Sequence, residues 1–223
     1  MIALDLSVLR RTPLQREPFP YLIVPGFVPV ESLAAINAAY PPINSPGSFP
    51  PGELKFGPAF QELLDALQGE ELRQVFEQKF RIDLGRRATM ITVRGRCGTR
   101  DGNIHTDARS KIITVLLYLN PQWEQAGGRL RLLRSATDLD NYFEEVPPAE
   151  GTLLAFQRTD NSWHGHKPFI GERRVIQLNW VTGQWRERFE ILRHRGSAWV
   201  KRLCQRSARS KKRLKGMEFS GDR

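Results

Sequence analysis

The segment NIHTDARSKIITVLLYLN, residues 103–120, is the most informative part of this chain of 223 residues. Its second part, Lys111 to Asn120, is rich in aliphatic and β-branched residues, is strand-sized and predicts a buried β-strand. His105 and Asp107 stand just before this strand and two residues apart. Because side chains two residues apart along an extended chain point the same way, both are expected on one face at the edge of the strand.

Short runs of the same kind surround this segment and are separated by Gly, Pro, Asn and Asp. They span residues 88–95, 127–135, 143–148, 151–158 and 173–182. Several short strands at such spacing are typical of a sandwich or barrel. We therefore expect an α+β protein, mainly β, with N-terminal helices packed against a sandwich or barrel core, for which a double-stranded β-helix (jelly roll) is one solution.

The first part of the chain shows a different periodicity. Residues 1–27 predict an extended lead-in, and the apolar spacing of residues 30–40 predicts a helix that ends before two prolines. Residues 41–58 are rich in Pro and Gly and predict a loop over a site. Residues 57–80 predict one or two helices with a buried apolar face.

The positive charge is concentrated at the end of the chain. The net charge is +10, and residues 186–223 hold 13 Lys and Arg against 4 Asp and Glu, a balance of +9. We expect three regions: a strand and helical support region (1–87), a mainly β core (88–185) and a basic, helical or partly disordered tail (186–223). Residues 186–215 suit an anionic membrane surface or a polyanion, or form a solvated helix that binds nothing.

The cysteines, the apolar runs and the N-terminus indicate where in the cell the protein is expected. The two cysteines, Cys97 and Cys204, lie far apart and form no CxxC metal motif, so reduced thiols are expected. No apolar run is long enough to span a bilayer, and the N-terminus lacks the features of a signal peptide. We expect a cytoplasmic protein, peripheral at the membrane if the tail binds it, and the sequence indicates no specific protein partner.

A metal site is the chemistry that the histidines favour. Two imidazoles and one carboxylate on one face of an octahedral ion, with the other positions open, are typical of non-haem Fe(II). His105 and Asp107 supply two ligands, and a third is expected from SWHGHKP, residues 162–168, which follows the strand at 151–158. His164 and His166 are both available in this segment. The competing interpretation is that His105 and Asp107 are ordinary turn residues.

Residues 88–182 resemble the prolyl 4-hydroxylase-like branch of the 2-oxoglutarate/Fe(II)-dependent dioxygenases. The resemblance is carried by a series of motifs in the order found in that family. They are His105-x-Asp107, Tyr118-Leu-Asn120, Gly127-Gly128-x-Leu130, Gly151 to Phe156, His164-x-x-x-Pro168, Arg174 and Trp180. The combination is far more specific than any one of its parts.

The resemblance implies a role for each matched residue. The residues that would bind iron are His105, Asp107 and His164. Arg174 would pair with the distal carboxylate of 2-oxoglutarate, with Tyr118 as a hydrogen-bond partner and Thr114 lining the pocket. Arg173 is also available, and the distances from Pro168 and Trp180 select Arg174. One departure stands out: Arg94 occupies a position where relatives often carry tyrosine, which points to an anionic substrate.

The function implied is hydroxylation of an unidentified substrate, coupled to oxidative decarboxylation of 2-oxoglutarate to succinate, with Fe(II) as cofactor and ascorbate as reductant. The substrate classes considered are a small molecule, a sugar- or lipid-linked intermediate, and a peptide. Two alternatives remain. One is a cupin-like metal-dependent dioxygenase or isomerase that does not use 2-oxoglutarate, and the other is a non-catalytic polyanion-binding protein that acts through its basic tail.

Overall fold

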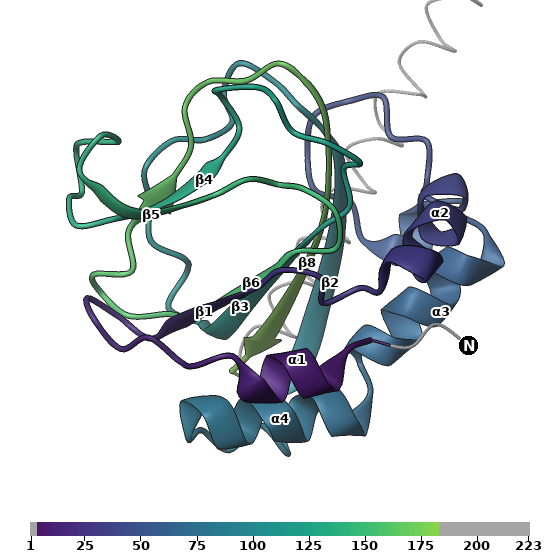
Figure 1. Cartoon of the computed structure of the whole chain (residues 1–223). Coiled ribbons are helices and arrows are strands. Elements are labelled where there is room, and N and C mark those ends of the chain that lie inside the picture. The colour runs from purple at the N-terminus through teal and green to yellow at the C-terminus, as the bar shows by residue number, and fades with distance from the viewer. Residues whose placement is uncertain (1–3, 183–223) are drawn as a thin grey trace, which may run out of the picture. The chain divides into compact units, whose positions relative to one another are not determined.

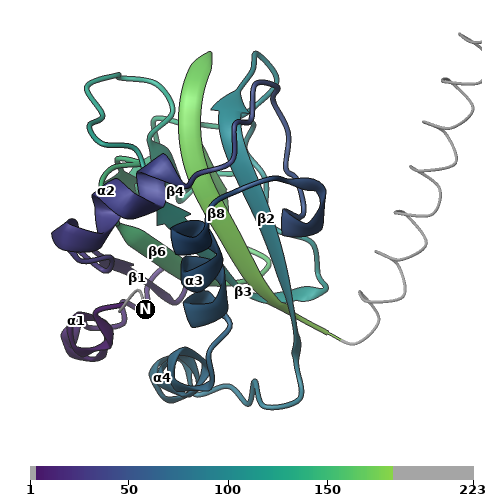
Figure 2. The same cartoon turned by 90° about the vertical axis from the view of Figure 1, so that its right-hand side faces the viewer.

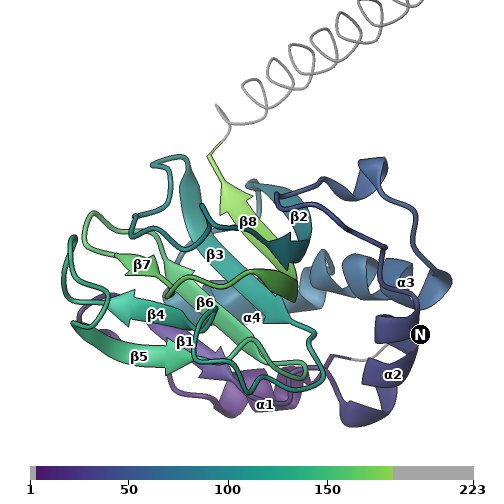
Figure 3. The ribbon, with the colours of Figure 1, turned by 90° about the horizontal axis from the view of Figure 1, so that it is seen from above.

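Two antiparallel β-sheets form the centre of the computed structural model, which describes residues 4–182 (Figure 1). The larger sheet has the order β1-β6-β3-β8-β2 and the smaller one β5-β4-β7. The strands of the larger sheet are β1 (Tyr21–Val24), β6 (Leu153–Gln157), β3 (Lys111–Tyr118), β8 (Gly171–Val181) and β2 (Ala88–Cys97). Those of the smaller sheet are β5 (Tyr142–Val146), β4 (Leu130–Leu133) and β7 (His164–Gly165). Figure 3 shows the two sheets from above.

Helices cover the outer face of the larger sheet, as Figure 2 shows. They are α1 (Leu6–Arg11), α2 (Val30–Ala38), α3 (Pro58–Leu67) and α4 (Glu70–Phe80), with a short 3-10 helix, η1, at Pro51–Glu53. Local sequence explains their limits: α2 ends before Pro41-Pro42, α3 begins with a proline, and α4 ends where Arg81 turns into the left-handed region. The α+β jelly-roll prediction is confirmed.

Side chains along the central strands point alternately to the two faces of the larger sheet, so the core has two layers. In β3, Ile113, Val115 and Leu117 pack toward the helices, in one apolar cluster with Trp180 of β8. The intervening residues of β3 face the space between the sheets, where Tyr118 joins a second cluster. A buried aliphatic side chain contributes about 1.5–3 kcal/mol, so a shift of register by one residue would be costly on both faces. This fixed register determines which side chains can reach the site.

Two elements differ from the sequence-based expectation. The extended lead-in predicted for residues 1–27 is wrong at α1, where the Asp5 side chain caps the helix by accepting a hydrogen bond from the Val8 N–H and Leu9 is fully buried. Strand β7 was not predicted because it has only two residues. The helical pattern over residues 57–80 resolves into α3 and α4, which break at Gln68-Gly69.

Two of the remaining expectations, on membrane spans and on Cys97, concern residues that the structure describes. Within residues 4–182, no helix is both long enough and apolar enough to cross a membrane. Cys97 is buried and free, and burial raises the pKa of its thiol. Cys204 and the basic segment 186–215 lie outside the described residues, so the proposed tail interactions and region boundaries remain predictions.

Candidate active site

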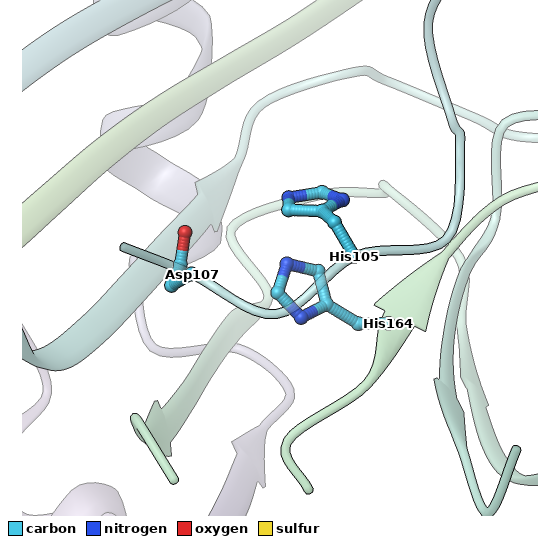
Figure 4. A group of neighbouring side chains, drawn as sticks. All are labelled: His105, Asp107 and His164. Carbon is cyan, nitrogen blue, oxygen red and sulfur yellow. The ribbon is translucent and has the colours of Figure 1, made fainter. Parts of the chain in front are cut away.

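Three side chains from two distant segments converge at one point between the sheets. One ligand atom each of His105, Asp107 and His164 can be chosen so that all three lie within 4.8 Å of one another. Figure 4 shows the two imidazoles and the carboxylate grouped around a common space. Asp107 and His164 are buried, whereas His105 is exposed. The arrangement leaves one side of the group open, as a metal that must also bind exogenous ligands requires.

Backbone contacts hold these two segments together. The N–H of His105 donates to the carbonyl of His164 and the reverse bond is also made, each at 3.0 Å. The loop before His105 lies tightly against the strand of His164: a Cβ on Gly102 (φ +94°) would come within 2.5 Å of His166, and a Cβ on Gly165 within 2.8 Å of the Gly102 carbonyl. Glycine at both positions therefore permits the close approach that brings the ligands together.

Hydrogen bonds fix the tautomers of both histidines. The Nδ1 of His105 lies 2.9 Å from the Asn103 carbonyl oxygen, and the Nδ1 of His164 lies 3.0 Å from that of Ser162. Since a carbonyl can only accept, each Nδ1 carries the proton and each Nε2 keeps its lone pair for a metal. Burial lowers the pKa of His164 to about 4, so this imidazole is neutral at physiological pH and ready to bind a cation.

The Asp107 carboxylate is ionised and held in place from both sides. Lys111 contacts one of its oxygens, and the hydroxyl of Thr114 donates to the other at 2.5 Å. Burial by itself raises the pKa of this carboxyl, but Lys111, His164 and Thr114 together lower it below its ordinary value. A carboxylate has about four lone-pair positions, so these contacts leave room for an ion. The donor set thus fits Fe(II).

A pocket of about 350 Å³ opens beside these ligands. Its walls are partly apolar, from Leu116, Leu130 and Val175, and partly polar, with Gln177 and Thr114 on the two central strands. Ser48 also lines it, so the predicted loop at 41–58 does reach the site. This size suits a small organic acid together with part of a second molecule.

Arg173, not Arg174, reaches this pocket. Its side chain is buried, with 4% of the residue exposed, and its Nε donates to the Gly128 carbonyl at 2.8 Å. No carboxylate pairs with this guanidinium within residues 4–182. A buried cation without an anion is costly, so the site requires an anionic ligand at this end of the pocket.

The prediction that Arg174 binds the co-substrate does not agree with the geometry. Arg174 points to the helix side of the sheet, where it pairs with Glu172, donates to Asn37 Oδ1 at 3.1 Å and lies over the ring of Tyr40. The physical reason is strand alternation: Arg174 shares a face with Trp180, as the sequence indicated, but that face packs against helices. The pocket lies on the opposite face, which Arg173 shares.

The other two predicted contacts lie on the pocket side of β3. The Tyr118 hydroxyl is fully buried and has no hydrogen-bond partner within the described part of the chain, and the Arg173 guanidinium lies 5.4 Å from the Tyr118 ring. Burial raises the pKa of Tyr118, opposed by the neighbouring Arg173, so the hydroxyl stays protonated and can donate. An unpaired buried donor beside an unpaired buried cation fits a carboxylate between them.

His166 lines the same pocket but does not belong to the metal-binding group. Its Nδ1 lies 2.9 Å from the Lys167 carbonyl oxygen, and burial together with the charge of Arg173 lowers its pKa to about 4. Of the two histidines between which the sequence left a choice, His164 is therefore the one placed with His105 and Asp107. His166 is a neutral polar group of the pocket wall, a position that sequence spacing did not indicate.

Comparisons with known proteins agree with this fold. Residues 95–182 match the family model described as the 2OG-Fe(II) oxygenase superfamily. A prolyl-4-hydroxylase of Pseudomonas putida is similar in structure at 19% identity and a TM-score of 0.57, over 82% of this chain and 95% of that one. The viral collagen prolyl hydroxylase vCPH of Paramecium Bursaria Chlorella virus-1 matches at 18% identity and a TM-score of 0.51, over 73% of this chain and 96% of that one.

A prolyl 4-hydroxylase of Phytophthora capsici is also similar, at 16% identity and a TM-score of 0.54, over 82% of this chain and 68% of that one. No curated protein sequence matches the chain. Residues 95–182 therefore form a domain of the 2OG-Fe(II) oxygenase kind, and it contains the group of two histidines and one aspartate that could hold a metal ion. The fold of the described chain is similar to that of the prolyl 4-hydroxylases named above.

Proposed function

We propose that this enzyme hydroxylates a C–H bond of its substrate while it decarboxylates 2-oxoglutarate oxidatively to succinate, and that His105, Asp107 and His164 hold the Fe(II). The observation that carries the proposal is the pairing of this ligand group with a buried, unpaired cation: Arg173 lines the same pocket. Bound iron and 2-oxoglutarate together supply the activation of dioxygen.

The residues of the chain bind and orient the co-substrate in this proposal. Arg173 grips the distal carboxylate of 2-oxoglutarate, and the Tyr118 hydroxyl donates a hydrogen bond to the same group. Thr114 lines the pocket and holds the Asp107 carboxylate in its orientation. The apolar wall at Leu116 and Val175 keeps water away from the reacting centre. Ascorbate is proposed as the reductant that keeps the iron ferrous.

A cupin-like activity without 2-oxoglutarate is the less favoured alternative, because it gives no role to the buried Arg173. The substrate class stays open among a small molecule, a sugar- or lipid-linked intermediate, and a peptide. Prolyl residues, on which the structurally similar enzymes are named as acting, are one candidate within the last class. Residues 1–87 are proposed to support the barrel, and residues 186–215 to bind an anionic membrane or polyanion.

Succinate production tests the proposal. The full chain is incubated with 2-oxoglutarate, ascorbate and Fe(II), and succinate is measured by NMR with and without candidate substrates. We expect slow succinate formation that requires Fe(II), rises with substrate and is lost in Asp107→Ala. Arg174→Gln, on the opposite face of the same strand, is the matched control and keeps the activity. Succinate formation that Asp107→Ala leaves intact contradicts the proposal.

A further inference from the structure

The pocket carries more positive charge than iron and 2-oxoglutarate can use. Six charged side chains line it: Arg94, Arg100, Lys111, Arg173, Asp101 and Asp107. Four are cationic and two anionic, which leaves two positive charges in excess. Fe(II) adds two and the 2-oxoglutarate dianion removes two, so the same excess remains once both are bound. A confined cationic excess of this kind favours a further anion.

One of the two excess positive charges is located at one part of the wall. Lys111 is paired with Asp107, and Arg173 serves the co-substrate under the function proposed above. The groups that remain are Arg94 and Arg100, with Asp101 as the one acid beside them. These three residues belong to the end of β2 and the turn that follows it. This group of residues therefore includes neither a proposed metal ligand nor Arg173.

The Arg94 side chain is held in position, but not all of the N–H donors of its guanidinium are used. Its Nε donates to the Gly47 carbonyl at 3.3 Å, and one terminal nitrogen contacts Asp101 Oδ1 at 3.1 Å. The other oxygen of Asp101 accepts from the Gly98 N–H at 2.7 Å, so this carboxylate is shared. A guanidinium has about five N–H donors, and two are used here. The remaining donors are pre-oriented, which lowers the entropic cost of binding a ligand.

Arg100 completes the group from the exposed rim of the pocket. Its side chain makes no ion pair with any residue in the range 4–182. Ser48 and Asn103 line the same region and can add neutral hydrogen bonds. We propose that the substrate carries a carboxylate or phosphate group and that Arg94 and Arg100 bind this group. The inference rests on the proposed function, because it counts iron and 2-oxoglutarate among the charges.

The test must distinguish binding of the substrate anion by Arg94 from binding of the co-substrate by the same residue. Arg94 pairs across the sheet with Val175, which is two residues from Arg173 on the same strand. Arg94 could therefore serve the co-substrate together with Arg173. The measurement must fill the iron and co-substrate positions first and then follow a further anion.

Phosphorus NMR provides such a measurement. The full chain is loaded with Mn(II) and N-oxalylglycine, an inert analogue of 2-oxoglutarate, and inorganic phosphate is added. Paramagnetic Mn(II) relaxes the phosphorus nucleus only if phosphate binds near the metal. We expect saturable relaxation in the wild-type protein and a dissociation constant raised about tenfold in Arg94→Gln and in Arg100→Gln, because each loses a charged hydrogen-bond donor. Labelled acetate, followed by carbon NMR, tests the same prediction for a carboxylate.

Arg109→Gln is the matched control, since Arg109 is exposed, lies just before β3 and does not line the pocket. It is expected to bind both anions as the wild type does. Equal binding in all four proteins, or no saturable relaxation by either anion in the wild type, overturns the inference. An Arg94→Gln protein that loses N-oxalylglycine assigns Arg94 to the co-substrate and also overturns it. A wild-type protein that binds neither Mn(II) nor N-oxalylglycine refutes the proposed function itself, and the inference with it.

Discussion

His105 and His164 are 59 positions apart in the sequence and are joined by two reciprocal backbone hydrogen bonds of 3.0 Å. The centroids of their imidazole rings are 4.3 Å apart. This bridge sets the spacing of the imidazoles before any ion binds. A site assembled by the backbone loses little conformational entropy when the metal enters. Metal binding should therefore stabilise a protein that is already folded, rather than fold it.

The first prediction concerns this stabilisation. Mn(II) or anaerobic Fe(II) should raise the unfolding temperature of the wild-type protein, because a ligand at about 100 times its dissociation constant adds about 2.7 kcal/mol. The shift should disappear in His164→Ala and Asp107→Ala. His166→Asn should keep it, since His166 lies outside the ligand group. Thermal unfolding with and without metal measures this shift. A shift that is lost only in His166→Asn would show that His166, and not His164, binds the metal.

The second prediction separates the two adjacent arginines. Arg173→Gln should weaken binding of 2-oxoglutarate to the Mn(II)-loaded protein about 10- to 100-fold, because charged hydrogen bonds contribute about 1.5–3 kcal/mol. Arg173→Lys keeps the charge and should lose less. Arg174→Gln should change the dissociation constant by no more than about twofold, because Arg174 contacts Glu172 and Asn37 on the other face. Isothermal titration calorimetry distinguishes the two arginines. A larger loss of 2-oxoglutarate affinity in Arg174→Gln would support Arg174 as the binding residue, as the motif spacing predicted.

The third prediction uses the unpaired hydroxyl of Tyr118. Tyr118→Phe should raise the dissociation constant of 2-oxoglutarate about five- to tenfold, since it removes one donor to the carboxylate. The same variant should be more stable than the wild type without ligand, by about 1 kcal/mol, because the buried hydroxyl has no partner there. Urea unfolding and ligand titration together give both quantities. A variant that is destabilised without ligand would show that the hydroxyl already has a partner.

The sequence predicted the fold and the grouping of His105, Asp107 and His164 better than the positions of the two adjacent arginines, for physical reasons. The period-two pattern of β3 identified which of its residues share a face, and the H-x-x-x-P motif selected His164 over His166. The choice between Arg173 and Arg174 required knowing which face of β8 meets the helices, and both faces of that strand carry buried apolar residues. Counting two residues back from Val175, which lines the pocket, gives Arg173.

The residues that the sequence missed are those whose position depends on loops. His166 reaches the pocket because the turn at Gly102 packs against it, and Arg100 because the same turn bends over the site. Neither contact follows from local periodicity. The cap of α1 by Asp5 is different, because an Asp before an apolar helical segment is a signal that the sequence does contain.

The last prediction is a pH dependence that arises from His166. Burial lowers its pKa from the ordinary 6.5 to about 4, so between these values the unfolded chain binds a proton that the folded protein does not. Stability of the metal-free protein should therefore fall as the pH drops from about 6.5 toward 4, with His166 contributing up to about 3 kcal/mol by the lower limit. His164 adds to the loss in the same range. In His166→Asn the decline should be shallower, as measured by urea unfolding at a series of pH values, with exposed Arg109→Gln as a control for net charge. A slope identical to that of the wild type would mean that His166 titrates normally in the folded protein and is not buried as described.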